Sequence, residues 1–262
     1  MHLVVHAGFH KTGTSSLQQT LAANRARLSP VARILLKPDM PGLTEAARAY
    51  SASADPVDWA FYLAEAARVF EALGGDDRTV LVSSEDLAGH MPFRHGATGY
   101  DAAPRLMAGL CEAAAAAIRR PHRIDILFTT RAPGPWVASC HAQHLRATRI
   151  TDDATAYAAR ALPHADLAAE VARIAATVPA TVHQAALEDI ADGPLGPLDA
   201  LLDLADIAPA LRAALRPQPR ANTALPPDTL DALLALNRSD RPWPAVREAK
   251  ARLIRQARKT PA

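Results

Sequence analysis

The sequence predicts a three-layer α/β/α fold with a mostly parallel central sheet. Short apolar runs rich in β-branched residues recur along the chain, and longer alanine-rich stretches with helical spacing separate them. Strands that alternate with helices in this way form parallel sheets, because each helix returns the chain to the start of the next strand. The sequence has neither an internal repeat nor a clear linker, so residues 1–262 are expected to form a single domain.

The composition narrows the class of protein. Hydrophobic residues make up 49% of the chain and charged residues 21%, which is ordinary for a globular protein. The formal net charge of +2 does not indicate a nucleic-acid-binding surface. The two cysteines, Cys111 and Cys140, lack the CxxC spacing, so neither a disulfide framework nor a zinc ribbon is expected. A cytoplasmic location is expected, because the sequence shows no signal-peptide pattern and no apolar stretch of about eighteen residues.

The first strand, Leu3–Val5, is short and β-branched, as suits a buried parallel strand. A helix follows, with Leu17, Leu21 and Leu28 on one face. Similar apolar runs predict four more strands, at residues 31–36, 79–84, 124–130 and 180–183.

Helices are predicted between and after these strands. An alanine-rich helical stretch covers residues 43–73; we interpret its aromatic residues, such as Trp59 and Tyr62, as core and expect Gly74 to be its C-cap. Pro133 fits the first turn of a helix that runs to about Arg146. Other helical patterns cover residues 104–119 and 151–177, short proline-broken pieces from Leu187 onward, and residues 245–258.

The turn between the first strand and the first helix has the composition of an anion-binding loop. Backbone N–H groups at a helix N-terminus point towards a bound anion, and the helix dipole favours negative charge there. Gly8, Gly13 and Ser15 keep the spacing of the nucleotide-triphosphate loop Gly-x-x-x-x-Gly-Lys-Ser/Thr. Thr14 occupies the lysine position, and the lysine lies three residues earlier, at Lys11. A kinase without that lysine would lack the cation that reaches the β- and γ-phosphates, so the loop indicates a different anion.

The segment His6–Gln18 resembles the 5′-phosphosulfate-binding loop of sulfotransferases that use 3′-phosphoadenosine 5′-phosphosulfate (PAPS), especially the bacterial and carbohydrate-type branch. The resemblance implies a P-loop NTPase-like fold and PAPS as co-substrate, with no metal required. It also implies that Lys11 is catalytic and contacts the bridging oxygen and the sulfuryl group. The loop amides and hydroxyls would hold the 5′-phosphate, so the residues expected to bind the cofactor are His10, Lys11, Thr12, Gly13, Thr14, Ser15 and Ser16.

Polar groups also follow the carboxyl ends of two later strands, at Ser83–Asp86 and Thr130–Arg131. Ligands of open α/β sheets bind beyond these strand ends. Resembling sulfotransferases place a glutamate just after a strand as the general base, which makes Glu85 the candidate for removing the acceptor proton. A glutamate in this place is also a common acid at a helix N-terminus, and His90 and His95 are competing bases.

Arg131 and Ser139 resemble the 3′-phosphate site of the same family, an arginine at a strand end with a serine eight positions later. A guanidinium offers a planar fork for phosphate oxygens. The alternative is an arginine that closes a strand and a serine on a solvated helix face. The family often has an acidic residue where this chain has Ala132. A weaker resemblance over residues 220–238 adds Arg220 as a cofactor-binding candidate.

Two further groups have ordinary interpretations. His141 and His144 lie three apart with no third ligand in the pattern, so no metal site is expected there. The basic residues of the last helix are interpreted as a solvated face, with an anionic acceptor or a membrane surface as the alternative; they are Arg247, Lys250, Arg252, Arg255, Arg258 and Lys259.

The resemblance therefore implies transfer of the sulfuryl group of PAPS to a hydroxyl or amine of an unidentified small-molecule, carbohydrate or lipid acceptor. Two rivals are a nucleotide-dependent kinase and a non-catalytic nucleotide-binding protein of the same fold.

Overall fold

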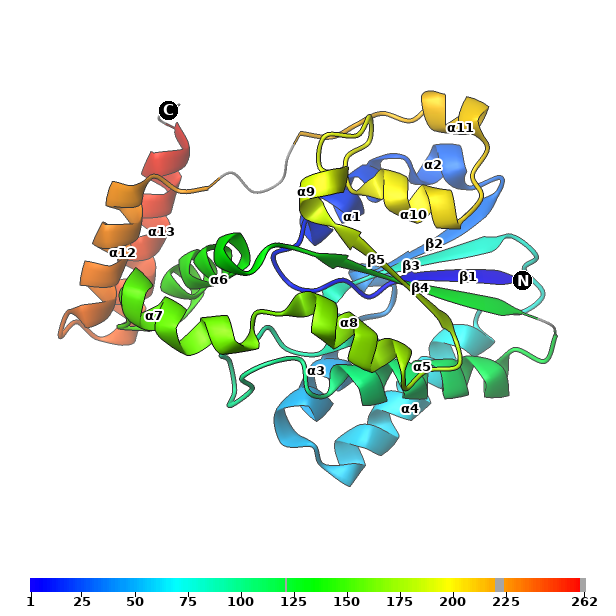
Figure 1. Ribbon diagram of the computed structural model, residues 1–262, viewed down its shortest axis with the longest axis horizontal. Helices are drawn as coiled ribbons and strands as arrows, with labels where there is room; N and C mark the ends of the chain where they lie inside the picture. The colour runs from blue at the N-terminus through cyan, green and yellow to red at the C-terminus, as the bar shows by residue number, and fades with distance from the viewer. Residues whose placement is uncertain (121, 220–223, 260–262) are drawn as a thin grey trace. The chain divides into compact units, whose positions relative to one another are not determined.

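The computed structural model describes residues 1–120, 122–219 and 224–259. Five parallel strands form a sheet in the order β2-β3-β1-β4-β5 (Figure 1). The strands are β1 (His2–His6), β2 (Ala32–Leu36), β3 (Thr79–Ser83), β4 (Arg123–Thr130) and β5 (Thr181–Ala186). Helices flank this sheet, which confirms the predicted three-layer α/β/α fold of P-loop-like type.

Helices cover both faces of the sheet (Figure 1). On one face lie α1 (Thr14–Ala23), α2 (Arg25–Leu28), α10 (Leu198–Leu204) and α11 (Pro209–Ala213). On the other lie α3 (Pro41–Ser53), α4 (Pro56–Glu71), α5 (Ala103–Ala117) and α8 (Leu167–Ala175). Three short helices join the layers: η1 (Lys37–Asp39), η2 (Glu85–Ala88) and α9 (Leu187–Ile190).

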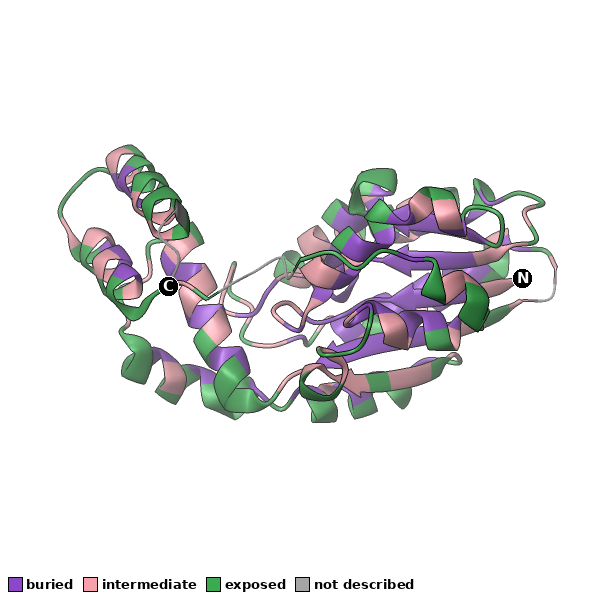
Figure 2. Cartoon of the chain, turned by 90° about the horizontal axis from the view of Figure 1, so that it is seen from above, coloured by how far each residue is buried: buried purple, intermediate pink, exposed green. Residues whose placement is uncertain are grey.

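Strands β1–β4 are mostly buried, whereas β5 at one edge of the sheet has no buried residue; Figure 2 shows the buried strands in purple. In β1, Leu3 and Val4 are fully buried, which explains its continuous apolar sequence. The predicted apolar face of α1 and α2 is confirmed, since Leu17, Leu21 and Leu28 are all buried in the core cluster that includes α10. This packing fixes the start of α1 against the end of β1, and so it fixes the loop between them.

Three predicted helices are each divided in the structure, and the first of them, with Leu17, Leu21 and Leu28, becomes α1 and α2. The stretch 43–73 breaks at Ala54, which has a left-handed backbone (φ 52°), and Asp55 then caps α4 by accepting from the Val57 N–H at 2.7 Å. Gly74 is not the C-cap of α4, because that helix ends earlier and Ala72 is its cap. The stretch 151–177 is likewise divided into α7 (Ala154–Ala161), η3 (Leu162–His164) and α8.

Contacts within the chain divide it into two compact units, Met1–Ala132 with Asp166–Ala221 and Pro133–Ala165 with Asn222–Ala262. The first holds the whole sheet, and the single-domain organisation stays a prediction. The helices of the second are α6 (Pro133–Ala147), α7, η3, α12 (Pro227–Arg238) and α13 (Trp243–Lys259). None of the helices in the described ranges is long and apolar enough to cross a membrane.

One residue of α13 corrects the expected solvated basic face. The side chains of Arg247, Arg252, Arg255 and Arg258 are exposed, as expected, but Lys250 is only 2% exposed. Lys250 Nζ donates to the carbonyl oxygens of Leu145 at 2.6 Å and Thr148 at 2.7 Å. Lys250 therefore provides a hydrogen-bond donor for carbonyl groups at the carboxyl end of α6, and its side chain is packed inside the second unit.

Candidate functional site

The predicted site residues of the first unit lie at the point where the direction of the chain across the sheet reverses. β1 and β3 are neighbours, but β1 leads across β3 to β2, whereas β3 leads across β1 to β4. The crevice beyond the carboxyl ends of two such strands is where open α/β sheets bind ligands. The glycine-bearing loop follows β1, and Glu85 follows β3.

The loop after β1 leads into the N-terminus of α1. Gly13, with φ 92°, is the N-cap of α1; no side chain caps this helix, and its first turn has no acidic residue. The first N–H groups of an α-helix have no partner within the helix, so this end of α1 is suited to an anion. Gly8 (φ 23°) has no room for a side chain, because a Cβ there would lie 2.7 Å from His6 Nε2 and 2.8 Å from Thr14 Cγ2.

A network of buried polar side chains holds the loop against the ends of β1, β3 and β4. His6 Nδ1 lies 2.8 Å from Ser83 Oγ, and its Nε2 lies 3.3 Å from Thr129 Oγ1. Thr12 Oγ1 lies 2.7 Å from the same Thr129 oxygen and donates to the Phe9 carbonyl at 2.6 Å. Burial lowers the pKa of His6 to about 3, so its ring is neutral. Because Thr12 is fully buried, its hydroxyl anchors the loop, and its backbone is the part left for a ligand.

Lys11 lies in the loop between β1 and α1 and has a left-handed backbone conformation, with φ 71°. Such a backbone costs on the order of 1–3 kcal/mol for a residue other than glycine and persists where the surroundings impose it. Arg131 Nη1 donates to the Lys11 carbonyl at 3.4 Å, which brings the predicted 3′-phosphate arginine next to the predicted 5′-phosphate loop. Ser139 lies on α6 in the second unit, and its pairing with Arg131 stays a prediction. Arg220 lies outside the described residues.

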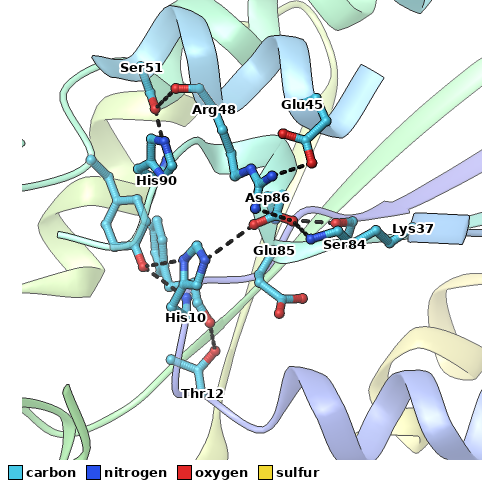
Figure 3. A network of polar contacts seen from close by, with 12 residues as sticks. His10, Thr12, Lys37, Glu45, Arg48, Ser51, Ser84, Glu85, Asp86 and His90 are labelled. Carbon is cyan, nitrogen blue, oxygen red and sulfur yellow. Dashed lines mark hydrogen bonds and ion pairs between the residues drawn. The ribbon is translucent and has the colours of Figure 1, made fainter. Parts of the chain in front are cut away.

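Glu85 opens η2 directly after β3 and lies beside α1. Its Oε2 accepts a hydrogen bond from Gln18 Nε2 at 2.7 Å. Ser84 caps η2 by accepting from the Asp86 N–H at 3.2 Å. In Figure 3 the carboxylates of Glu85 and Asp86 point in different directions, so the two acidic residues serve different neighbours.

Asp86, which the sequence analysis named only among the polar residues after a strand, lies next to His10, Lys37 and Arg48 (Figure 3). His10 Nε2 lies 3.5 Å from its Oδ1, and Lys37 Nζ and Arg48 Nη1 lie 2.5 Å and 3.8 Å from its Oδ2. Burial would raise the pKa of Asp86, but hydrogen bonds from His10 and Lys37 outweigh it and lower that pKa to about 2. The only signal in the sequence was the adjacency of Asp86 to Glu85 at a strand end.

Tyr100 fixes the other side of His10. The His10 backbone N–H donates to the Tyr100 hydroxyl at 2.8 Å, and His10 Nδ1 lies 3.2 Å from the same oxygen. Since that oxygen already accepts from the backbone, its own proton can be donated to Nδ1. This arrangement places the ring proton on Nε2, facing Asp86.

The comparisons with known proteins add no family. No protein-family model matches the chain, and no curated protein sequence matches it.

The histidines predicted as competing bases lie together in the loop after η2. The rings of His90 and His95 are 4.5 Å apart, and His90 is tied to α3 by its backbone N–H, which donates to Ser51 Oγ at 2.8 Å. Burial, and then the nearby charges of His95 and Arg48, lower the pKa of His90 to about 4. Its ring is therefore a weak proton acceptor at neutral pH.

His141 and His144 have structural partners in the second unit. His141 Nε2 lies 2.9 Å from the Asp152 carbonyl oxygen, and His144 Nδ1 lies 2.8 Å from the Tyr157 hydroxyl. Across the described ranges, no cluster of three or more His, Cys, Asp or Glu side chains could hold a metal ion.

Proposed function

We propose that this chain is a sulfotransferase that moves the sulfuryl group of PAPS to a hydroxyl or amine of an acceptor. The displaced lysine carries the proposal. Thr14 occupies the P-loop lysine position and is buried. Lys11 instead lies in the loop after β1, where the direction of the chain across the sheet reverses. A loop of this kind suits a phosphosulfate better than a triphosphate, whose transferring group needs a cation at the Thr14 position.

The groups around the loop fit the anionic part of PAPS. Gly8 has no room for a Cβ, and the uncapped N-terminus of α1 presents backbone N–H groups. The 5′-phosphate would bind there, with Ser15 and Ser16 in the first turn, and Arg131 would meet the 3′-phosphate. PAPS supplies an activated sulfuryl group, whose bond to the phosphate oxygen breaks as the bond to the acceptor oxygen or nitrogen forms.

Two residues of the crevice have roles in this step. Lys11 would stabilise the negative charge that develops on the leaving phosphate. Glu85, which Gln18 orients through a 2.7 Å hydrogen bond, would take the proton of the acceptor. The carboxylate of Asp86 is already engaged with Lys37 and His10, so Glu85 is the better base of the two acidic residues.

Thermal unfolding with nucleotide ligands tests the proposal. Adenosine 3′,5′-bisphosphate should stabilise the protein without magnesium, by about 2.7 kcal/mol at a hundred times its dissociation constant. Stabilisation by Mg-ATP but not by the bisphosphate would favour a kinase and overturn the proposal.

A transfer assay then separates an enzyme from a binding protein. Labelled sulfate from PAPS should appear in at least one member of a pool of carbohydrates, lipids and phenols. Bisphosphate binding with no transfer, not even slow hydrolysis to water, would instead indicate a non-catalytic protein of the same fold.

A further inference from the structure

A pocket of about 270 Å³ lies beside the crevice, within the first unit, between the end of α3 and the segment 88–102. Ser51 and Ala52 line it from α3, and His90, His95 and Tyr100 line it from the segment after η2. None of the residues predicted for PAPS binding lines this pocket. The proposed binding of PAPS therefore leaves this pocket without an occupant.

Gly89 allows the two walls of the pocket to approach each other. With φ 95°, it has a backbone that other residues rarely adopt, and a Cβ there would lie 2.6 Å from Ser51 Cβ. This approach lets the next residue, His90, donate its N–H to Ser51 Oγ, while the Ser51 hydroxyl donates to the Arg48 carbonyl at 2.8 Å. The pocket wall is thus fastened to α3 by specific contacts.

The segment that forms the other wall holds an unusual backbone. Phe93 and His95 have positive φ values of 64° and 50°, and the Phe93 N–H donates to the Ala97 carbonyl at 2.6 Å. Together with Lys11, they are three of the five non-glycine residues with positive φ in the described chain. Strain of this kind clusters at ligand sites, where the surrounding structure maintains it.

Tyr100 joins the pocket to the predicted reaction centre. It lines the pocket, and its hydroxyl contacts the backbone and the ring of His10, the residue before Lys11. Its ring also packs 4.5 Å from Phe9 in the same loop. A molecule in the pocket would therefore lie against the wall that supports the PAPS loop.

The lining indicates what such a molecule is like. It contains the Thr98 hydroxyl, two imidazoles and the carboxylate of Asp101, but no lysine or arginine, and its Ser51 hydroxyl is already engaged with Arg48 and His90. Hydroxyls and a neutral imidazole both donate and accept hydrogen bonds, as a hydroxylated ligand requires. An anionic ligand would meet the Asp101 carboxylate with no lysine or arginine in the lining; Arg173, whose Nη2 lies 3.6 Å from Asp101 Oδ1, is outside it. The volume also falls below the roughly 300–1,000 Å³ of pockets for drug-sized ligands.

We infer that this pocket receives the acceptor, and that it takes a small uncharged polyhydroxyl group of about one sugar ring in size. That the bound group is the sulfate acceptor rests on the proposed function, whereas binding of a neutral polyhydroxyl group in the pocket does not. The pocket would present one hydroxyl of the group beside Tyr100 and the Lys11 loop.

A pair of matched variants tests the inference. Ala52 is an exposed residue of the pocket wall, and Ala60 is an exposed residue of α4 outside the lining. Ala52→Phe should fill the pocket, whereas Ala60→Phe adds the same side chain elsewhere. Saturation-transfer NMR with the full chain and adenosine 3′,5′-bisphosphate would compare glucose, myo-inositol, glucuronate and 4-nitrophenol as probes.

Glucose or myo-inositol should bind the wild-type chain and Ala60→Phe alike, and bind Ala52→Phe about tenfold more weakly or not at all. Bisphosphate affinity should be equal in all three proteins. Preference for glucuronate or 4-nitrophenol, binding unaffected by Ala52→Phe, or no binding of either neutral probe would overturn the inference. The bisphosphate could fail to bind while Ala52→Phe still weakens the binding of a neutral probe. That result would overturn the proposed function and leave the pocket as a binding site for a polyhydroxyl group.

Discussion

His10 Nε2 lies 3.5 Å from Asp86 Oδ1, and this contact ties the loop after β1 to the turn after β3. Asp86 also binds Lys37, which follows β2, so one buried carboxylate connects the carboxyl ends of three neighbouring strands. Removing that carboxylate should therefore affect both the stability of the crevice and the position of Lys11.

The first prediction concerns Asp86→Asn. The folded-state pKa of Asp86 is about 2, against an ordinary value of 3.8. A depressed pKa means that the stabilisation is present above the unfolded-state pKa and is lost as the pH falls through about 4 to about 2. At pH 7 the variant should lose about 2 kcal/mol of unfolding free energy.

Urea unfolding from pH 7 down to pH 3 would measure this difference, which should narrow towards the acid end. Asp240→Asn, at an exposed position, is the control and should change little. A difference that stays constant with pH would show that packing, not the charge of Asp86, is responsible.

The second prediction concerns Arg131→Ala. If Arg131 binds the 3′-phosphate, its loss should weaken the binding of adenosine 3′,5′-bisphosphate by on the order of 1.5–3 kcal/mol. The binding of adenosine 5′-phosphate should be nearly unchanged. Calorimetric titration of both nucleotides measures this selectivity. Because Arg131 also donates to the Lys11 carbonyl, equal weakening of both ligands would assign it to the support of the loop instead.

The fold was predictable where burial imposes a continuous pattern. Strands buried on both faces need unbroken apolar runs, as in β1–β4; the fifth predicted run corresponds to β5, an edge strand with no buried residue. The breaks within the alanine-rich helices were missed, because alanine fits either a helix interior or its end. Asp55-Pro56 was the local signal for the start of α4, since the Asp55 side chain caps the helix and proline fits its first turn.

The site was predictable only where its residues are close in sequence. The loop from Gly8 to Ser16 forms one continuous motif, and Glu85 marks a strand end. Asp86, Lys37 and Tyr100 meet His10 because β2, β3 and β1 are neighbours and because the segment after η2 folds back. That strand order leaves no fixed spacing in the sequence, so no motif could have joined these residues.

The third prediction separates the charge of Lys11 from its backbone. Lys11→Ala and Lys11→Gly both remove the ammonium group, but only glycine adopts the left-handed conformation at φ 71° without the steric cost of a Cβ atom. The glycine variant should therefore be more stable than the alanine variant by about 1 kcal/mol. Both should bind PAPS more weakly and transfer sulfate more slowly than the wild-type chain, by similar factors.

Urea unfolding and the labelled-sulfate assay provide the two measurements. Wild-type transfer in Lys11→Gly would exclude the ammonium group from the reaction. Equal stability of the two variants would show that the loop relaxes around alanine without cost.

The fourth prediction decides whether Glu85 is the base. Glu85→Gln keeps the size of the side chain and a possible hydrogen bond with Gln18, but it removes the basicity. The variant should keep its affinity for adenosine 3′,5′-bisphosphate and lose sulfuryl transfer by about 10²–10⁴-fold. Glu71→Gln, an exposed change at the end of α4, is the matched control and should keep full activity. Kinetics would be measured on whichever acceptor the wild-type chain sulfates. Full activity of Glu85→Gln would move the proton transfer to His90 or His95, and the low pKa of His90 would then predict activity that persists well below pH 6.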